Sequence, residues 1–398
     1  MISKNVSKVK PSITMEMSSK AKAMIAEGID VIALSAGEPD FSTPAHICEA
    51  GISAINEGFT RYTPASGIIE LKKAVCEKFR RDNNLNYKTS QIIINCGAKH
   101  SVFLAIFALL NQGEEVIIPS PYWVSYPDMT KLAGGVPVVI ECKPQNNFKI
   151  TPEQLKRAIT ERTKLLILNT PSNPTGMYYR EEELRALAEV IEESDIYVLS
   201  DEIYEKLIYD GNRHVSIASF SDTMFRRTIT VNGVSKTYSM TGWRIGYAAG
   251  AEEIITAMGK IQSQETSNPC SISQKAALAA ITGPQDFLKS RVDEFSERRL
   301  YIVERLNSIK GVSCLKPEGS FYVFPDVSAH YGKKFNGRVI DGSFALCEYM
   351  LNEQHIAFVP GAGFGADAYI RISYAASMEN IEKALNKFEN GLKNLVKN

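Results

Sequence analysis

The sequence lacks the cysteine and histidine patterns that mark several classes of protein. It contains seven cysteines, an odd number, and no Cys-x-x-Cys pair. Scattered cysteines of this kind are typical of reduced thiols in a cytoplasmic protein rather than of a disulfide framework. The five histidines show no metal-ligand spacing, so we expect no metal site.

An excess of charge of one sign and long apolar runs are also missing. The 45 Lys and Arg residues balance 45 Asp and Glu residues, which leaves no basic footprint for nucleic acid or an anionic membrane. The longest apolar run, residues 102–110, is far shorter than the roughly 20 residues of a membrane helix. Residues 1–8 are polar and lack the apolar core of a signal peptide. We therefore expect a soluble, cytoplasmic protein with no nucleic-acid or membrane partner.

The sequence does contain the composition and patterns of an α/β protein. Its 398 residues are 44% hydrophobic and 23% charged, which fits one large domain with a smaller one. Short apolar runs rich in β-branched residues alternate with amphipathic segments, and seven of these runs are predicted strands: 92–95, 115–118, 136–141, 165–169, 196–200, 228–231 and 245–249. This alternation predicts a mostly parallel, seven-stranded sheet with helices on both faces.

The pattern changes near residue 285. A long charged helix is predicted at 291–308, followed by the run Gly319-Ser320-Phe321-Tyr322-Val323-Phe324 and a helical tail. Thr282-Gly283-Pro284 before it marks a linker or a turn. We expect a large domain over 46–285 and a smaller α/β domain formed by 1–45, with a first strand at 31–34, and 286–398.

One short stretch carries groups for both imine and phosphate chemistry. Ser235-Lys236 follows the predicted strand 228–231, and Arg244 comes eight residues after the lysine. Loops at the carboxyl ends of strands in open α/β sheets usually bind ligands. An amine can bond reversibly to an aldehyde, and a guanidinium and a hydroxyl both suit phosphate oxygens. The stretch therefore fits an aldehyde cofactor that carries a phosphate, although any single lysine is more often a surface residue.

Two further motifs precede this stretch: Asn173-Pro174-Thr175-Gly176 and Asp201-Glu202-Ile203-Tyr204. In this order, and over nearly the whole chain, the motifs resemble the fold-type I pyridoxal-phosphate enzymes, specifically the class I/II aminotransferases. The resemblance implies pyridoxal 5′-phosphate held as a Schiff base on Lys236. It also implies that Lys236, once freed, moves the substrate proton, and that Asp201 and Tyr204 assist the catalysis.

The resemblance assigns further residues to the cofactor. Asp201 follows the predicted strand 196–200 and would keep the pyridine nitrogen protonated; otherwise it caps a helix. Ser235, Arg244 and the junction Gly97-Ala98-Lys99 would hold the phosphate, since helix N-termini favour anions, although the junction alone predicts only a turn. Asn173 and Tyr204 would contact the 3′ oxygen of the cofactor, and Trp123 would stack on its ring unless it only packs in the core.

The substrate contacts implied by the resemblance begin with Arg371. This arginine interrupts the apolar run Ile370-Arg371-Ile372, where a charge is costly unless it meets an anion. The family assigns its position to the substrate α-carboxylate, with Gly37, Trp123 and Asn173 nearby. The alternative is an internal pair with a carboxylate.

Three residues bear on specificity and assembly. The run Ile94-Asn95-Cys96-Gly97-Ala98-Lys99 resembles the bacterial subgroup Ib of aspartate aminotransferases, in which a lysine here meets the distal substrate carboxylate. A solvated lysine is the other interpretation. Lys10 aligns with a position implicated in prephenate use by some relatives. Tyr62 resembles a tyrosine that reaches the cofactor phosphate of the neighbouring subunit, which implies a homodimer, or else it packs in a loop.

The resemblance thus implies an aspartate aminotransferase, with ping-pong transfer of an amino group between L-aspartate and 2-oxoglutarate that gives oxaloacetate and L-glutamate. Aromatic, alanine or prephenate aminotransferases share the fold and are alternatives. A pyridoxal-phosphate lyase or synthase shares most of the motifs as well. A regulatory protein that uses such a domain as a sensor normally carries a fused DNA-binding domain, and the residues before 31 show no helix-turn-helix pattern.

Overall fold

A seven-stranded sheet forms the centre of the larger part of the protein. The computed structural model describes residues 6–9 and 13–396. Within these residues the sheet has the order β2-β8-β7-β6-β5-β3-β4, and only β8 runs antiparallel to its neighbours. Its strands are β2 (Ile92–Asn95), β3 (Glu115–Ser120), β4 (Val136–Glu141), β5 (Thr163–Asn169), β6 (Tyr197–Asp201), β7 (Thr228–Gly233) and β8 (Gly246–Ala249). The prediction of a mostly parallel sheet is confirmed.

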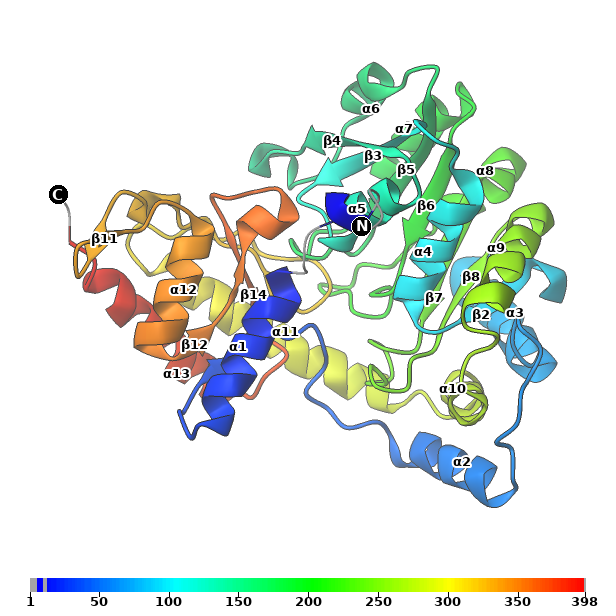
Figure 1. The fold of residues 1–398 in the computed structure, drawn as a ribbon, viewed down its shortest axis with the longest axis horizontal. Helices are drawn as coiled ribbons and strands as arrows, with labels where there is room; N and C mark the ends of the chain where they lie inside the picture. The colour runs from blue at the N-terminus through cyan, green and yellow to red at the C-terminus, as the bar shows by residue number, and fades with distance from the viewer. Residues whose placement is uncertain (1–5, 10–12, 397–398) are drawn as a thin grey trace.

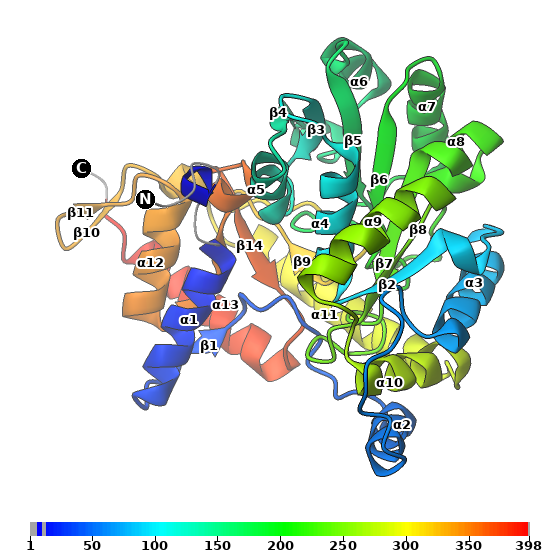
Figure 2. The same cartoon turned by 45° about the vertical axis from the view of Figure 1, so that its right-hand side comes forward.

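Helices cover both faces of this sheet, as Figures 1 and 2 show. Successive strand residues point to opposite faces, so Ile93 packs in one hydrophobic cluster while Ile92 and Ile94 pack in another. One face carries α4 (Ala98–Leu109), α5 (Ser125–Leu132) and α9 (Glu252–Glu265). The other face carries α3 (Ile69–Asn83), α6 (Pro152–Ala158), α7 (Glu181–Glu192), α8 (Asp222–Arg227) and α10 (Ser271–Thr282). Helix α2 (Ala45–Asn56) packs on α10 and projects from this body (Figure 1).

The strand and helix sequences explain this layering. All six residues of β7 are buried, as expected for a strand covered on both faces. In α7 the stripe of Leu184, Leu187, Ala188 and Ile191 is buried, and three glutamates lie in the first turn, where the helix dipole favours negative charge.

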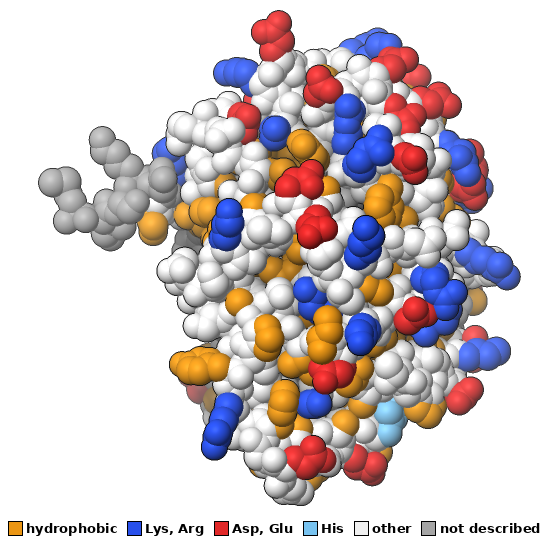
Figure 3. Space-filling model, turned by 90° about the vertical axis from the view of Figure 1, so that its right-hand side faces the viewer, with side chains coloured by type: hydrophobic (Ala, Val, Ile, Leu, Met, Phe, Trp, Pro, Cys, Tyr) orange, Lys and Arg blue, Asp and Glu red, His pale blue; other side chains and the backbone are white. Residues whose placement is uncertain are grey.

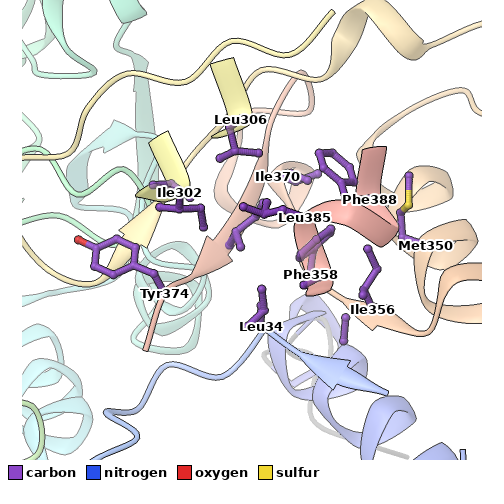
Figure 4. Close-up of a cluster of buried hydrophobic side chains, with 14 of the residues drawn as sticks. Leu34, Ile302, Leu306, Met350, Ile356, Phe358, Ile370, Tyr374, Leu385 and Phe388 are labelled. Carbon is purple, nitrogen blue, oxygen red and sulfur yellow. The ribbon is translucent and has the colours of Figure 1, made fainter. Parts of the chain in front are cut away.

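The two ends of the chain form a second hydrophobic core. Strand β1 pairs in parallel with β12, through Ile32 with Ile356, so hydrogen bonds join the beginning and the end of the chain. In Figure 4, Leu34, Ile302 and Phe358 lie together in this core. The elements are α1 (Ile13–Ala26), β1 (Ile32–Ala33), α11 (Phe287–Asn307), β9 (Tyr322–Val323), β10 (Lys334–Phe335), β11 (Arg338–Val339), α12 (Ser343–Gln354), β12 (Ile356–Ala357), β13 (Val359–Pro360), β14 (Ile370–Ser373) and α13 (Met378–Lys393).

The long helix α11 connects the two cores, and its bounds lie close to the predicted 291–308. The domain boundaries at 46 and 285 stay a prediction. Among the described residues, no helix combines the length and the apolarity needed to cross a membrane. On the face shown in Figure 3, basic and acidic side chains intermingle, in keeping with the balanced charge of the sequence.

Candidate active site

A cavity of about 350 Å³ opens at the carboxyl ends of β5, β6 and β7, between the sheet and the second core. Open α/β sheets bind ligands at this edge. The structure brings eleven of the predicted site residues to its wall: Gly37, Ala98, Lys99, Trp123, Asn173, Asp201, Tyr204, Ser235, Lys236, Arg244 and Arg371. These residues come from segments as far apart in the chain as Gly37 and Arg371. A hydrogen bond from Arg371 to the carbonyl of Ser35, 336 positions away, joins these two segments.

Lys236 reaches into this cavity from the loop after β7. Its amine donates a hydrogen bond of 2.5 Å to the carbonyl oxygen of Gly37. Burial lowers the pKa of the Lys236 amine to about 8, the negative charge of Glu38 opposes this shift, and the positive charges of Arg371 and Arg244 add to it. The amine is therefore neutral at a lower pH than an ordinary lysine, which makes it a usable nucleophile and base.

Asp201 is the last residue of β6, and its carboxylate is buried in the cavity wall. The hydroxyl of Tyr126 donates a hydrogen bond of 2.7 Å to Asp201 Oδ2. Burial raises the pKa of the Asp201 carboxyl to about 6, while this hydrogen bond from Tyr126 limits the rise. The site thus contains a buried acid poised to pair with a cation.

The first turn of α4 and Arg244 form a positively charged corner. Gly97 has a φ of 88°, and a Cβ at this position would lie 2.5 Å from Arg244 Nη2. Gly246 of β8 faces the same turn, and a Cβ there would lie 2.2 Å from the backbone nitrogen of Ala98. Glycine is required at both positions because only a residue without a side chain lets strand, turn and guanidinium approach so closely. Backbone N–H groups and a guanidinium in this arrangement suit a phosphate.

Arg371 lies on β14 with only 2% of its surface exposed. Its Nη1 donates to Asn173 Oδ1 at 3.0 Å, and its Nη2 donates to the carbonyl of Ser35 at 2.7 Å. The buried Nε has no hydrogen-bond partner. Because no carboxylate within the described ranges pairs with Arg371, the structure does not support the internal-pair interpretation.

Lys99 lies in the cavity wall beside Trp123. The Lys99 amine sits 5.0 Å from the centroid of the Trp123 ring. Burial lowers the pKa of Lys99, and the charge of Arg244 lowers it further. Tyr62 is 90% exposed and does not line the cavity of its own chain. Lys10 lies outside the described residues.

Six wall residues were not anticipated from the sequence, and three of them carry polar side chains: Tyr126, Asn169 and Tyr322. Asn169 donates to the Asp201 carbonyl at 2.9 Å and accepts a hydrogen bond from the backbone of Asn173 at 2.8 Å. Tyr126 follows Trp123 by three residues, and Asn169 precedes Asn173 by four. Proximity to a motif was therefore an available signal for these two, whereas Tyr322 stood in an apolar run without one.

A group of ionisable side chains lies next to the site on the chain. Ligand atoms of Glu202, Glu205 and His214 lie within 4.8 Å of one another. Protein groups already bind these oxygens: Glu202 accepts from His214 at 2.8 Å and from two serine hydroxyls, and Glu205 pairs with Lys78. This network is complete without a metal ion.

The sequence is similar to those of known proteins. The family described as aminotransferase class I and II matches residues 29–388. The chain belongs to this family. The aspartate aminotransferase of Bacillus subtilis is 50% identical to this aminotransferase over 388 residues, which are 98% of each chain. A protein of Cereibacter sphaeroides named aspartate/prephenate aminotransferase is 50% identical over 385 residues, or 96% of each chain.

Solved structures show the same fold. The aspartate aminotransferase of Rhizobium meliloti superposes on this aminotransferase with a TM-score of 0.95 at 44% identity, with all of both chains covered. The Thermus thermophilus aspartate aminotransferase with maleate gives a TM-score of 0.92 at 42% identity and covers 98% of this chain and 99% of its own. The predicted family and fold class are confirmed.

Proposed function

We propose that this aminotransferase binds pyridoxal 5′-phosphate and transfers an amino group between L-aspartate and 2-oxoglutarate, giving oxaloacetate and L-glutamate. One observation carries the proposal. The cavity holds four cationic side chains that form no ion pair with a carboxylate in the described part of the chain: Lys99, Lys236, Arg244 and Arg371. A phosphate and the two carboxylates of an acidic substrate supply the missing anions. The names of the relatives from Bacillus subtilis and Rhizobium meliloti support this choice of substrate.

The wall of the cavity fits the proposed cofactor. Arg244, Ser235 and the Gly97–Ala98 turn would hold the phosphate, Asp201 would face the ring nitrogen, and Trp123 would cover the ring. Asn173 and Tyr204 supply polar groups for the ring oxygen. When bound, the cofactor supplies an aldehyde carbon for a bond to an amine and a ring that takes up the electron pair left when the substrate Cα loses its proton.

Lys236 is the residue that we expect to move this proton. Its amine is the basic group inside the cavity with a pKa of about 8, close enough to neutrality to accept and return a proton. Asp201, with a pKa of about 6, stays an anion at pH 7 and balances a positive ring nitrogen.

Two cations would recognise the substrate. Arg371 presents a guanidinium to the α-carboxylate, held by Asn173 and Ser35. Lys99 would bind the distal carboxylate, because its amine reaches the cavity and has the Trp123 ring rather than an anion beside it. Gly37 would contribute backbone groups at the same end as Arg371.

Prephenate is a second candidate substrate. The relative from Cereibacter sphaeroides carries both activities in its name, and Lys10, the residue that the resemblance connects with prephenate, lies outside the described residues. Measurements with different amino donors distinguish these substrates from those of an aromatic or alanine aminotransferase and from the reaction of a lyase.

We also propose a homodimer in which Tyr62 reaches the cofactor phosphate of the partner subunit. The 90% exposure of this tyrosine supports a role outside its own chain. A Tyr62→Phe variant should then bind the cofactor more weakly, and analytical ultracentrifugation should find a dimer. The cytoplasmic location likewise stays a proposal.

The function is tested by spectroscopy of the purified, cofactor-loaded protein. Aspartate and glutamate added separately should remove the absorption band of the lysine-bound cofactor, while alanine and phenylalanine should act more slowly. Oxaloacetate should accumulate in equal amount to the glutamate formed from 2-oxoglutarate. Borohydride should fix the cofactor on Lys236, and Lys236→Ala should bind cofactor without turnover. Amino donors without an oxo-acid product would favour the lyase alternative.

A further inference from the structure

Tyr322 connects the two halves of the site. It lies on β9 in the second core, is only 1% exposed, and lines the cavity. Its hydroxyl is 2.9 Å from the hydroxyl of Tyr204, which follows β6 of the large sheet. Neither tyrosine hydroxyl has another hydrogen-bond partner within the described residues. The hydroxyl pair therefore links elements from both sides of the cavity.

The ring of Tyr322 supports the arginine that faces the cavity. The Arg371 guanidinium carbon lies 4.5 Å from the centroid of this ring. Two hydrogen bonds hold the Nη atoms of Arg371, but Nε has none. The Phe364 ring lies 5.2 Å from the same carbon. Aromatic rings this close to a guanidinium restrict its orientation, and a planar carboxylate partner requires a defined orientation.

Tyr322 also contacts the segment that meets the catalytic amine. A Cβ on Gly37 would lie 2.8 Å from the Tyr322 hydroxyl oxygen, so the phenol packs directly against this glycine. The carbonyl of Gly37 accepts the hydrogen bond from Lys236. Tyr322 thus contacts Arg371 and Tyr204 directly, and it contacts Gly37, the hydrogen-bond partner of Lys236.

We propose that Tyr322 is a positioning residue for the amino-transfer reaction. Its ring holds Arg371 in the plane that a substrate carboxylate needs, and its hydroxyl directs the proton of Tyr204 into the cavity. This inference rests on the proposed function.

The number of protons that the two phenols carry supports the proposed role of the Tyr322 hydroxyl. Burial raises the pKa of both tyrosines above the ordinary value, so each keeps its proton at neutral pH. Two hydroxyls that share one hydrogen bond use one proton between them. When Tyr322 donates, the proton of Tyr204 is free for an oxygen in the cavity, and the donated bond makes Tyr204 a stronger donor.

Two substitutions distinguish the role of the Tyr322 ring from the role of its hydroxyl. Tyr322→Phe keeps the ring, so the dissociation constant of maleate, a non-reacting dicarboxylate, and the KM for aspartate should stay within about twofold of wild type. The kcat should fall by about threefold to tenfold. The pH midpoint of the absorption change of the bound cofactor should rise by about half a unit to one unit, because a weaker Tyr204 donor stabilises a deprotonated cofactor less.

Tyr322→Leu removes the ring as well. We expect this variant to show the changes expected for Tyr322→Phe and, in addition, to bind maleate about fivefold to tenfold more weakly in calorimetry. Tyr349→Phe is the matched control: this buried tyrosine belongs to the same core, and its hydroxyl donates to the carbonyl of Gly391 at 3.0 Å, away from the cavity. It should leave the maleate constant and the pH midpoint unchanged.

A Tyr322→Phe protein with wild-type kcat and pH midpoint would overturn the role of the hydroxyl. Unchanged maleate binding by Tyr322→Leu would overturn the role of the ring, and a lower melting temperature as the sole effect would make Tyr322 a packing residue. Failure of the wild-type protein to bind cofactor or to transfer the amino group would instead contradict the proposed function.

Discussion

The Tyr126 hydroxyl and the Asp201 carboxylate form a hydrogen bond of 2.7 Å inside the protein. Both side chains are buried, at 2% and 6% exposure. A buried carboxylate favours its neutral form, and burial raises the pKa of Asp201 to about 6 despite this donor. Because this pKa lies below 7, the ionised form of Asp201 predominates at neutral pH. Asp201 would therefore be available at neutral pH as the anion for the ring nitrogen of the proposed cofactor, and the Tyr126 hydrogen bond favours this ionised form.

We predict that Tyr126→Phe raises the pKa of Asp201 further. The variant should lose affinity for pyridoxal phosphate as the pH falls, with a midpoint about one unit above that of the wild type. Fluorescence titration of the cofactor-free protein between pH 5 and 8 measures this midpoint. Tyr87→Phe, a buried tyrosine whose hydroxyl lies 3.4 Å from Thr230, is the control. Equal midpoints in wild type and Tyr126→Phe would contradict the assignment.

The Lys236 amine should react at unusually low pH in the cofactor-free protein. Its pKa is lowered from 10.5 to about 8, so the neutral, nucleophilic form appears as the pH rises through 8. Acylation at limiting reagent, followed by peptide mass spectrometry from pH 6 to 11, should give a midpoint near 8 for Lys236. Lys289, an exposed lysine on α11 with 84% of its side chain accessible, is the internal reference. A shared midpoint for both lysines would refute the shift.

Lys99→Met should change specificity more than catalysis. Loss of the amine removes the proposed partner of the distal carboxylate, so kcat/KM for aspartate should fall by about tenfold to 100-fold. The value for alanine or phenylalanine should change by less than about threefold, because these substrates carry no second carboxylate. Lys99→Arg keeps the charge and should recover part of the aspartate activity. An equal loss for all amino donors would point to the phosphate rather than the substrate as the partner of Lys99.

Asp210→Asn should destabilise the fold through Arg299. This arginine of α11 is fully buried, and its Nη1 and Nη2 bind both carboxylate oxygens of Asp210 at 3.0 and 2.6 Å. The guanidinium is buried, but the Asp210 side chain is 39% exposed. We therefore expect a loss of about 2 kcal/mol in the free energy of unfolding by urea at pH 7, less than for a fully buried pair. Lys316→Met, which removes an exposed partner 3.1 Å from Asp210, should cost less than about 1 kcal/mol.

The pair of Asp210 and Arg299 also makes the free energy of unfolding depend on pH. Hydrogen bonds from Arg299 lower the pKa of Asp210 from 3.8 to about 2. The stabilisation is complete above the unfolded pKa and is lost as the pH falls through the folded one. The difference between wild type and Asp210→Asn should therefore persist at pH 5 and disappear between pH 4 and pH 2. A constant difference across this range would show that packing, and not charge, is responsible.

Local patterns predicted much of this fold. The strands β2 and β4 have the predicted bounds, because apolar β-branched runs between turn residues leave few other choices. Tyr322 could not be predicted as a cavity residue, because its neighbours Phe321 and Val323 are apolar and a buried tyrosine packs in the core far more often than it contacts a ligand. Tyr126 was marked only by its position three residues after Trp123.

The sequence by itself determined the family, the succession of strands and helices, and the chemistry of the groups at Lys236, Asp201 and Arg371. These properties depend on residue type and on short-range order along the chain, which a sequence records directly. The tertiary structure alone decided which of these groups meet and how strongly each is perturbed. The pKa of Lys236, the Tyr126 bond to Asp201 and the contact of Tyr322 with Arg371 all arise from burial and proximity between distant segments. Desolvation and Coulomb forces depend on distances in space, and these exist only after the chain has folded.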